Sequence, residues 1–336
     1  MAVIVGTSMQ GNRSIHEKGC REGIAFFPQL IDHSLKIRKD SLRAQVMKSR
    51  RASLKLCSLG AVSYLAAVRA ETEQRFPIGV CDWNLGMKQN IGAFEVGKEI
   101  GVEGLQVSFS TPGSDFDLRD REVRDQYYER VEDTGIRMAS LGMGVLNQEP
   151  LATTPEAIGW VSDAIDTLAS MQKENPAEAP KVCLLAFFGK GDINGKPELM
   201  AKVVEKLKTV AKKAEDAGVI LGIESYLSAT EHLRIIEGVG SEAIQVYYDS
   251  ANSLAMGYDI YQEVVDLGAE RICQVHCKER KSLIGDGEVD FEEFRDSLVE
   301  AGYRDWLIME ASRPQGMNAV EAYRSNLKKL NSIFNA

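Results

Sequence analysis

The sequence predicts a closed (β/α)₈ barrel of eight parallel strands, each followed by a helix, in residues 75–336. The first observation is the alternation itself, because strand-like and helix-like runs follow one another along this whole stretch. The second is chemical, since the last four strand-like runs end on side chains of metal-binding types: Glu224, Asp249, His276 and Glu310. The third weighs against an open doubly wound sheet, the alternative fold, because no Gly-x-Gly-x-x-Gly follows the first strand.

Each expected strand is a short apolar run followed by a polar loop. We expect strands at 76–83, 104–110, 136–145, 181–188, 219–226, 244–250, within 271–280, and at 306–312. We expect helices at 93–100, 120–134, 154–173, 199–217, 230–237, 261–267, 290–301 and 319–334. Gly135 is placed to end one helix in a left-handed cap. Thr154 and Pro155 are placed to open another, with proline at the first helical position. No linker or low-complexity segment divides this region, which predicts a single domain.

The chain before residue 71 looks like a leader. Residues 1–46 show no sustained periodicity and predict an over-extended gene start or a disordered segment. Residues 47–70 contain the pair Arg50-Arg51, then a mildly apolar run that ends in Val68-Arg69-Ala70, with small residues at the −3 and −1 positions of a cleavage site. The pattern Ser-Arg-Arg-x-x-Leu-Lys resembles a twin-arginine export signal, which implies cleavage after Ala70 and a periplasmic mature protein. The apolar run is too short to span a membrane stably. The alternative interpretation is an N-terminal amphipathic helix.

The expected mature chain, residues 71–336, is strongly acidic. Residues 1–70 hold 12 of the 40 basic and 4 of the 49 acidic side chains, so the remaining 266 residues carry a formal net charge of −17. Such a surface repels nucleic acid and anionic lipid, and we expect no nucleic-acid partner. The four remaining cysteines all lie in strand-like runs, which predicts buried thiols and not a disulfide framework. They are Cys81, Cys183, Cys273 and Cys277.

The four strand-end residues predict a metal site. Glu224, Asp249, His276 and Glu310 follow one another at gaps of 25, 27 and 34 residues, each about the length of one strand–helix unit. In a barrel, the carboxyl ends of the strands converge on one mouth. A lone strand-end carboxylate is more often a helix cap or an ion-pair partner, but four in succession are hard to explain that way. Three carboxylates and one imidazole have a formal charge of −3 and suit Mn²⁺, Mg²⁺ or Co²⁺ better than a thiolate-preferring metal.

Several segments around these residues carry a family resemblance. They are GIES (222–225), YDSAN (248–252), VHCKE (275–279), IGDGEVDF (284–291), AGY (301–303) and IME (308–310). With them the chain resembles the xylose-isomerase-like barrel superfamily of sugar (phosphate) isomerases and epimerases, and most closely its ketose 3-epimerase and hydroxypyruvate-isomerase branches. The resemblance implies one divalent ion, Mn²⁺ first and Mg²⁺, Co²⁺ or Zn²⁺ as alternatives, at the four positions. It also implies that Glu224 and Glu310 move the proton.

The sequence departs from this pattern at two positions. Asn252 stands where many relatives carry a histidine that contacts the substrate, and Glu279 stands where an aspartate is more usual. The identity of the sugar therefore does not transfer with the resemblance.

The residue types also indicate the chemistry by themselves. Removing a proton from a carbon beside a ketone needs a base and an electrophile that holds the enediolate. Two carboxylates on opposite sides of that carbon can remove the proton and return it. Return to the opposite face epimerises the carbon, and return to the adjacent carbon isomerises the sugar. The prediction is a metal-dependent isomerase or epimerase of a small sugar or keto-sugar, with a homo-oligomer left open.

Four further side chains are candidates for substrate binding. Lys278 follows His276 by two residues, so it faces the same side of the strand and could neutralise an oxyanion; the alternative is a surface lysine. Trp83 ends the first strand and could pack on the apolar face of a sugar or in the core. Asn147 could hydrogen-bond a hydroxyl, and Asn252 lies beside the expected metal ligand.

Other functions use the same fold. A dehydratase or lyase acting on a keto-sugar or keto-inositol would share the metal and the base. A non-catalytic sugar-binding barrel would not require both glutamates. The metal-dependent DNA-repair endonucleases of the superfamily need several histidines for a zinc cluster, whereas only His232 and His276 follow the leader. His232 itself is expected on the surface at a helix start, and Lys190 could bind an anion or cap its loop.

Overall fold

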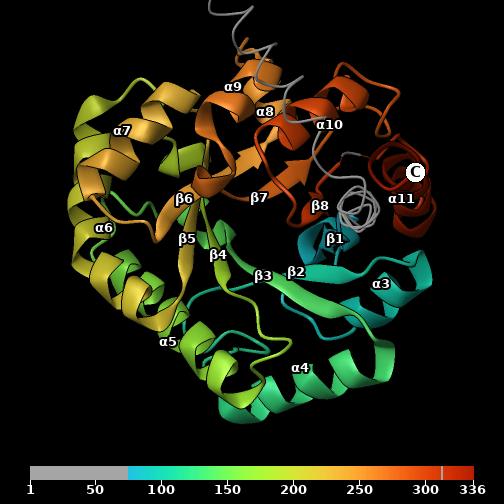
Figure 1. Ribbon diagram of the computed structural model, residues 1–336. Helices are drawn as coiled ribbons and strands as arrows, with labels where there is room; N and C mark the ends of the chain where they lie inside the picture. Colours follow the sequence, from blue (N-terminus) through green and yellow to red (C-terminus); the bar gives the residue numbers. More distant parts are fainter. Residues whose placement is uncertain (1–74, 312) are drawn as a thin grey trace, which may run out of the picture. The chain divides into compact units, whose positions relative to one another are not determined.

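The computed structural model describes residues 75–311 and 313–336, and within them eight parallel strands close into a barrel. Neighbouring strands in the barrel are neighbours in the chain, from β1 to β8, and the helices surround the strands (Figure 1). The predicted (β/α)₈ barrel is confirmed. The expected leader, residues 1–46 and 47–70, lies outside the described residues. In the described ranges no helix is both long and apolar enough to cross a membrane.

The elements agree closely with the predicted alternation. The strands are β1 (Ile78–Cys81), β2 (Gly104–Ser108), β3 (Arg137–Met143), β4 (Val182–Phe187), β5 (Ile220–Ser225), β6 (Ile244–Asp249), β7 (Ile272–Cys277) and β8 (Leu307–Met309). The α-helices are α3 (Ala93–Ile100), α4 (Arg121–Thr134), α5 (Ala157–Glu174), α6 (Pro197–Ala217), α7 (Ala229–Val239), α8 (Ser250–Ala255), α9 (Ile260–Leu267), α10 (Phe291–Glu300) and α11 (Ala319–Phe334). Short 3₁₀ turns are η2 (Asp82–Leu85), η3 (Gly144–Asn147), η4 (Gly189–Gly191) and η5 (Ala269–Arg271).

Most helix starts lie within two residues of the prediction, and two differences are larger. Helix α8 begins directly after β6 and was not predicted; the Asp249 side chain caps it by accepting the Asn252 N–H at 2.8 Å. Helix α5 begins at Ala157, so the expected start at Thr154 is wrong. Thr154 directly follows a turn at residues 151–153, and its N–H donates to the carbonyl of Pro150 at 2.8 Å, so its backbone belongs to that turn and precedes the helix. The left-handed cap predicted at Gly135 is confirmed, with φ 74°.

Strand register brings the four strand-end residues to one end of the barrel. Asp249 on β6 is paired directly with His276 on β7, and on the next ladder Cys277 is paired with Met309 of β8. Glu310 follows β8, where its N–H donates to the Cys277 carbonyl at 3.2 Å. Glu224 lies on β5, the strand before the one that carries Asp249, and is paired with Ala186 of β4. The strands are buried at nearly every position, and burial of their apolar side chains fixes their register. The four polar residues at the strand ends therefore lie at the same height along the barrel axis.

Each end of the barrel has a tryptophan seated on a glycine. At the carboxyl end, a Cβ on Gly142 would lie 2.9 Å from the ring of Trp83. At the amino end, a Cβ on Gly104 would lie 2.6 Å from the ring of Trp306. Both glycines therefore make room for an indole ring. Between the two rings the interior is filled by a small cluster: Cys81, Ala139, Val182, Leu184, Ala186, Tyr247, Cys273 and Ile308.

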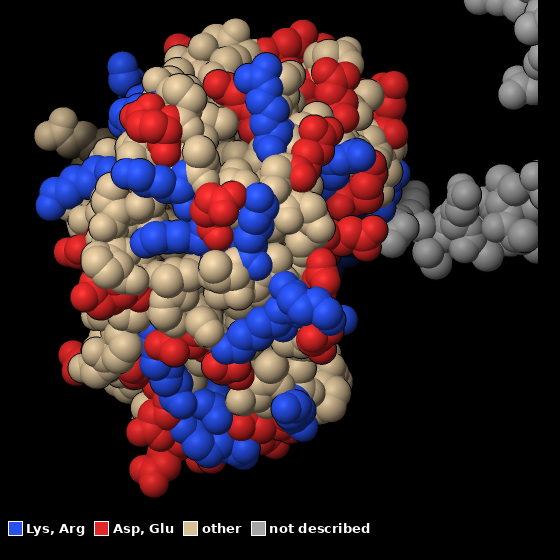
Figure 2. All heavy atoms as spheres, turned by 90° about the vertical axis from the view of Figure 1, so that its left-hand side faces the viewer, with Lys and Arg blue, Asp and Glu red and all other residues tan. Residues whose placement is uncertain are grey.

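The four cysteines of the described residues are free and buried, as predicted. The outer surface carries charges of both signs, and on the face shown in Figure 2 acidic and basic side chains are interspersed.

Candidate active site

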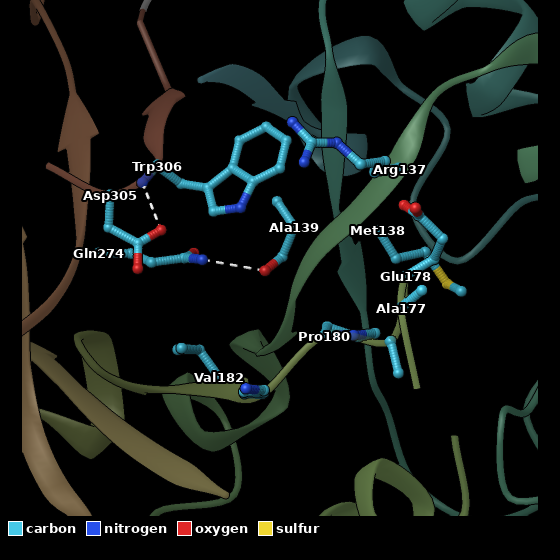
Figure 3. A pocket seen from close by; sticks show the side chains of 12 residues that line it. Arg137, Met138, Ala139, Ala177, Glu178, Pro180, Val182, Gln274, Asp305 and Trp306 are labelled. Atoms are coloured by element: carbon cyan, nitrogen blue, oxygen red, sulfur yellow. Dashed lines mark hydrogen bonds between the residues drawn. The ribbon is translucent and has the colours of Figure 1, made fainter. Parts of the chain in front are cut away.

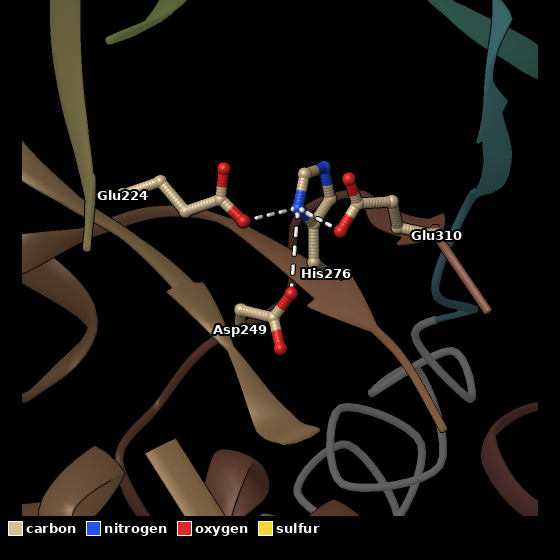
Figure 4. Close-up of side chains that lie close together, drawn as sticks. All are labelled: Glu224, Asp249, His276 and Glu310. Atoms are coloured by element: carbon tan, nitrogen blue, oxygen red, sulfur yellow. Dashed lines mark hydrogen bonds and ion pairs between the residues drawn. The ribbon is translucent and has the colours of Figure 1, made fainter. Parts of the chain in front are cut away.

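The four predicted ligands converge. Glu224, Asp249, His276 and Glu310 each offer one ligand atom, and these four atoms all lie within 4.8 Å of one another. Figure 4 shows the three carboxylates arranged around one edge of the imidazole. Nδ1 of His276 lies 2.8 Å from Oε1 of Glu224, 3.5 Å from Oε2 of Glu310 and 3.9 Å from Oδ2 of Asp249. A single ion at the centre of this group could reach all four side chains.

Glu310 has two further hydrogen-bond donors. Trp83 Nε1 donates to its Oε1 at 3.0 Å, and Lys278 Nζ donates to its Oε2 at 2.6 Å. Burial opposes the charge of Glu310, but Lys278 and His276 outweigh this and lower the pKa of its carboxyl group. Glu310 is therefore a fixed carboxylate at neutral pH. Lys278 is not the free surface lysine that was its alternative, because its side chain is only 20% exposed and is bonded inside the site.

Asp249 is the less satisfied carboxylate. Its Oδ1 caps α8, while its Oδ2 is buried and has no hydrogen-bond partner among the described residues. Lys278 Nζ lies 3.3 Å from that oxygen as an ion-pair neighbour. Burial first, and then the charges of Glu310 and Glu224, raise the pKa of Asp249 despite Lys278.

These observations fit a divalent cation. Three carboxylates share one ammonium group, so the cluster has an excess of negative charge that a dication would offset. The orphaned Oδ2 of Asp249 provides a free ligand oxygen directed at the group. Three carboxylate oxygens and one imidazole nitrogen form a hard donor set, which suits Mn²⁺, Mg²⁺ or Co²⁺.

A cavity of about 340 Å³ opens above the cluster. Its lining includes all four predicted substrate-binding residues, Trp83, Asn147, Asn252 and Lys278, together with the two glutamates. The oxygen of the Asn147 amide already accepts a hydrogen bond from the Phe188 N–H at 2.8 Å, which leaves its NH₂ group for a substrate. Lys190 is exposed and is absent from the lining.

Several side chains of this site were not identified from the sequence. Phe188 and Tyr226 meet edge to face, with ring centroids 4.8 Å apart, and both line the cavity, as does Lys88. Gln106 lies beneath the cavity and contacts His276. A lone glutamine within the apolar run of β2 was the one sequence signal that could have identified Gln106.

The expectation that His232 lies on the surface is wrong. His232 is only 3% exposed and lies behind the site, on the first turn of α7. Its Nδ1 lies 3.1 Å from the Ser228 carbonyl and its Nε2 lies 3.0 Å from the hydroxyl of Ser225, the residue after Glu224. Burial lowers the pKa of His232 to about 4. It is therefore a neutral, structural imidazole that helps to hold the end of β5.

Glu279, the other departure from the family pattern, organises the loop after β7. It is buried, and its carboxylate accepts the N–H groups of Glu288 at 3.2 Å and Val289 at 3.1 Å. A Cβ on Gly287 would fall on this carboxylate, which explains a glycine there. The substitution keeps a carboxylate that closes the loop beside the site.

A second cavity, of about 180 Å³, lies at the opposite, amino-terminal end of the barrel. Figure 3 shows its lining, where Gln274 donates to the Ala139 carbonyl at 2.9 Å and Trp306 lies between Arg137 and Asp305. The Arg137 guanidinium stands 4.5 Å from the centre of the Trp306 ring. The lining of this cavity includes none of the four predicted ligands, so the candidate active site is the cavity at the carboxyl end.

The comparisons with known proteins agree with this fold. A family model described as "Xylose isomerase-like TIM barrel" matches residues 94–333. The chain is 21% identical over 202 residues to 2-epi-5-epi-valiolone 7-phosphate 2-epimerase of Actinoplanes sp., covering 60% of this chain and 72% of that protein.

Two solved structures illustrate the likeness in three dimensions. The structure of L-ribulose 3-epimerase matches with a TM-score of 0.62 at 18% identity, covering 77% of this chain and 95% of that one. The structure of 3-keto-D-glucoside 4-epimerase from E. coli matches with a TM-score of 0.60 at 15% identity, covering 77% and 100%. At these identities the two structures support the fold alone.

Proposed function

We propose that this chain, which belongs to the xylose isomerase-like TIM barrel family, is a divalent-metal-dependent isomerase or epimerase of a sugar or keto-sugar. The observation that carries the proposal is the convergence of Glu224, Asp249, His276 and Glu310 within 4.8 Å beneath an open cavity. The similar proteins described above are named as epimerases, which supports an isomerase-class activity for the family.

In this proposal all four residues hold the metal, Mn²⁺ first. The metal, when bound, supplies Lewis-acid stabilisation for the oxyanion that develops on the substrate carbonyl. Glu224 and Glu310 come from strand ends on different sides of His276, as Figure 4 shows. One glutamate removes the proton from the carbon beside the carbonyl, and the other returns a proton on the opposite face.

The neighbouring side chains orient the two glutamates and the substrate. Trp83 and Lys278 hold the carboxylate of Glu310 through its two oxygens, which leaves that group little rotational freedom. Lys278 also brings a positive charge to the wall of the cavity, where an enediolate would lie. Asn252 and Asn147 provide amide groups at the cavity wall for substrate hydroxyls.

The decisive test is a turnover screen. Purified protein is stripped of metal, supplied with Mn²⁺, and incubated in D₂O with a panel of ketoses and keto-sugars. The expected result is an epimer or isomer that carries deuterium on the carbon beside the carbonyl, detected by NMR, unless that proton is shielded from exchange.

Two other outcomes identify the alternatives. Loss of water from the substrate would indicate a dehydratase with the same metal and base. Saturable sugar binding in the Mn²⁺-loaded protein, with neither conversion nor deuterium exchange, would contradict catalysis and favour a sugar-binding barrel.

A further inference from the structure

The two nitrogens of His276 face different surroundings. Nδ1 faces the three carboxylates, and its nearest neighbour among them is Oε1 of Glu224 at 2.8 Å. Nε2 points the other way, into the barrel, where Oε1 of Gln106 lies 2.8 Å away. The Cys81 thiol donates to the same oxygen at 3.3 Å. A buried glutamine on β2 is therefore the hydrogen-bond partner of the imidazole on the side away from the cavity.

This arrangement bears on how His276 could bind a cation. A neutral imidazole offers a lone pair at Nδ1 only while its proton stays on Nε2, and the hydrogen bond at Nε2 determines where that proton sits. Only the oxygen of a glutamine amide can accept a hydrogen bond from Nε2–H. We propose that Gln106 is a positioning residue, which keeps the His276 proton on Nε2 and directs Nδ1 at the metal. The inference rests on the metal site of the proposed function.

A packing role does not account for this glutamine. Gln106 is fully buried, and its amide nitrogen has no hydrogen-bond partner among the described residues. An apolar side chain of the same length would fill the space without burying an unpaired amide nitrogen, but it would remove the oxygen that faces His276 Nε2 and the Cys81 thiol. The imidazole is also packed independently, since the Tyr247 ring lies 4.5 Å from it, centroid to centroid. What Gln106 adds is an oxygen acceptor 2.8 Å from Nε2, closer than the Cys81 sulfur at 3.5 Å.

The test measures Mn²⁺ binding directly, by isothermal titration calorimetry on metal-stripped protein. Gln106→Met removes the acceptor at nearly constant shape, and Gln106→Glu keeps an oxygen there. Gln274→Met is the matched control, because Gln274 is also a buried glutamine inside the barrel, but its amide bonds Ala139 and Tyr247 and makes no hydrogen bond to His276. The thermal unfolding of each metal-free variant is recorded in parallel.

We expect Gln106→Met to weaken Mn²⁺ binding by about 10–100-fold, as for other partners of metal-bound histidines, while Gln106→Glu stays within about threefold of wild type. The metal-free Gln106→Met protein should be no less heat-stable than Gln274→Met, because it loses the acceptor of His276 and Cys81 but also an unsatisfied amide nitrogen. Gln274→Met should lower the unfolding temperature and leave Mn²⁺ affinity unchanged. This pattern separates positioning from a structural role.

Three results would overturn the inference. Wild-type affinity in Gln106→Met would show that the acceptor is dispensable. Equal losses in Gln106→Met and Gln106→Glu would assign the residue a packing role. Absence of Mn²⁺ binding in the wild-type protein would remove the proposed metal site, and with it the inference. If Gln106→Met does not fold, Gln106→Leu replaces it in the same comparison.

Discussion

The two ends of the barrel share one packing feature but differ in the polar groups that surround it. Each has a tryptophan ring resting on a glycine, Trp83 on Gly142 at the carboxyl end and Trp306 on Gly104 at the amino end. At the carboxyl end the indole N–H donates to Glu310, a member of the four-residue cluster. At the amino end the Arg137 guanidinium instead lies over the face of the Trp306 ring.

The difference lies in how the polar groups are satisfied. At the amino end, Gln274 donates to the Ala139 carbonyl and accepts from the Tyr247 hydroxyl, and Asp305 accepts the backbone N–H of Trp306. These groups therefore stabilise the fold. At the carboxyl end an oxygen of Asp249 has no hydrogen-bond partner among the described residues. A buried polar atom without a hydrogen-bond partner needs an explanation, and in a cluster of carboxylates a bound cation provides one. The comparison therefore predicts that substitutions at the carboxyl end change activity, whereas those at the amino end change only stability.

The largest effect is expected for the two glutamates. Glu224→Gln and Glu310→Gln each keep the size and one oxygen of the side chain but remove the basic carboxylate. Turnover should fall by at least ~10²-fold, as for loss of a general acid–base group, while thermal unfolding in the absence of metal shows that the fold persists. Near-normal turnover of either variant with Mn²⁺ bound would exclude the two-glutamate mechanism and make Lys278 the better candidate base.

The two glycines provide a direct comparison of the ends. Gly142→Ala and Gly104→Ala each add a methyl group against an indole ring, and each should lower the free energy of unfolding by about 1–3 kcal/mol through overpacking. Only Gly142→Ala should also reduce turnover, because a displaced Trp83 loses its hydrogen bond to Glu310. Denaturant unfolding and steady-state kinetics on both variants test this. Equal turnover in the two variants would mean that Trp83 does not position Glu310.

His232 predicts a pH dependence of stability at the carboxyl end. Its pKa is lowered by burial to about 4, so between pH 6.5 and 4 the unfolded chain binds a proton that the folded protein does not. Stability from this group is present above pH 6.5 and is lost as the pH falls through this range, by about 2 kcal/mol at pH 5. His232→Gln should reduce this slope between pH 7 and 5 in urea unfolding. An unchanged slope would mean that the buried imidazole is not its source.

The smallest effect is expected at the amino end. Arg137→Ala removes a cation from the face of Trp306, and since the Arg137 side chain is 43% exposed, its loss should lower stability by only about 0.5–1 kcal/mol. Turnover and Mn²⁺ affinity should remain at wild-type values. A loss of turnover in Arg137→Ala would show that the two ends of the barrel are coupled, and the comparison would fail.

The sequence by itself determined the fold and the identity of the central cluster. Strand-like runs at regular spacing predict a barrel, and a barrel places all strand ends on one rim, so Glu224, Asp249, His276 and Glu310 could be grouped without any coordinates. Lys278 followed from strand alternation, since it lies two residues after His276 and faces the same side. The positions of these residues could be predicted because each depends only on the place of the residue within its own strand.

Other features were decided only by the tertiary structure. Gln106 and Cys81 lie 170 and 195 residues from His276 in sequence, and only closure of the barrel brings them to its Nε2. His232 looked like a surface residue because its helix start is polar, yet packing of α7 against the end of β5 buries it. The sequence could place Asn147 near the site, but it could not predict that the Asn147 Oδ1 accepts a hydrogen bond from the Phe188 N–H. The physical reason is the same in each case: a hydrogen-bond partner on a distant strand is set by register and closure, which local sequence patterns do not encode.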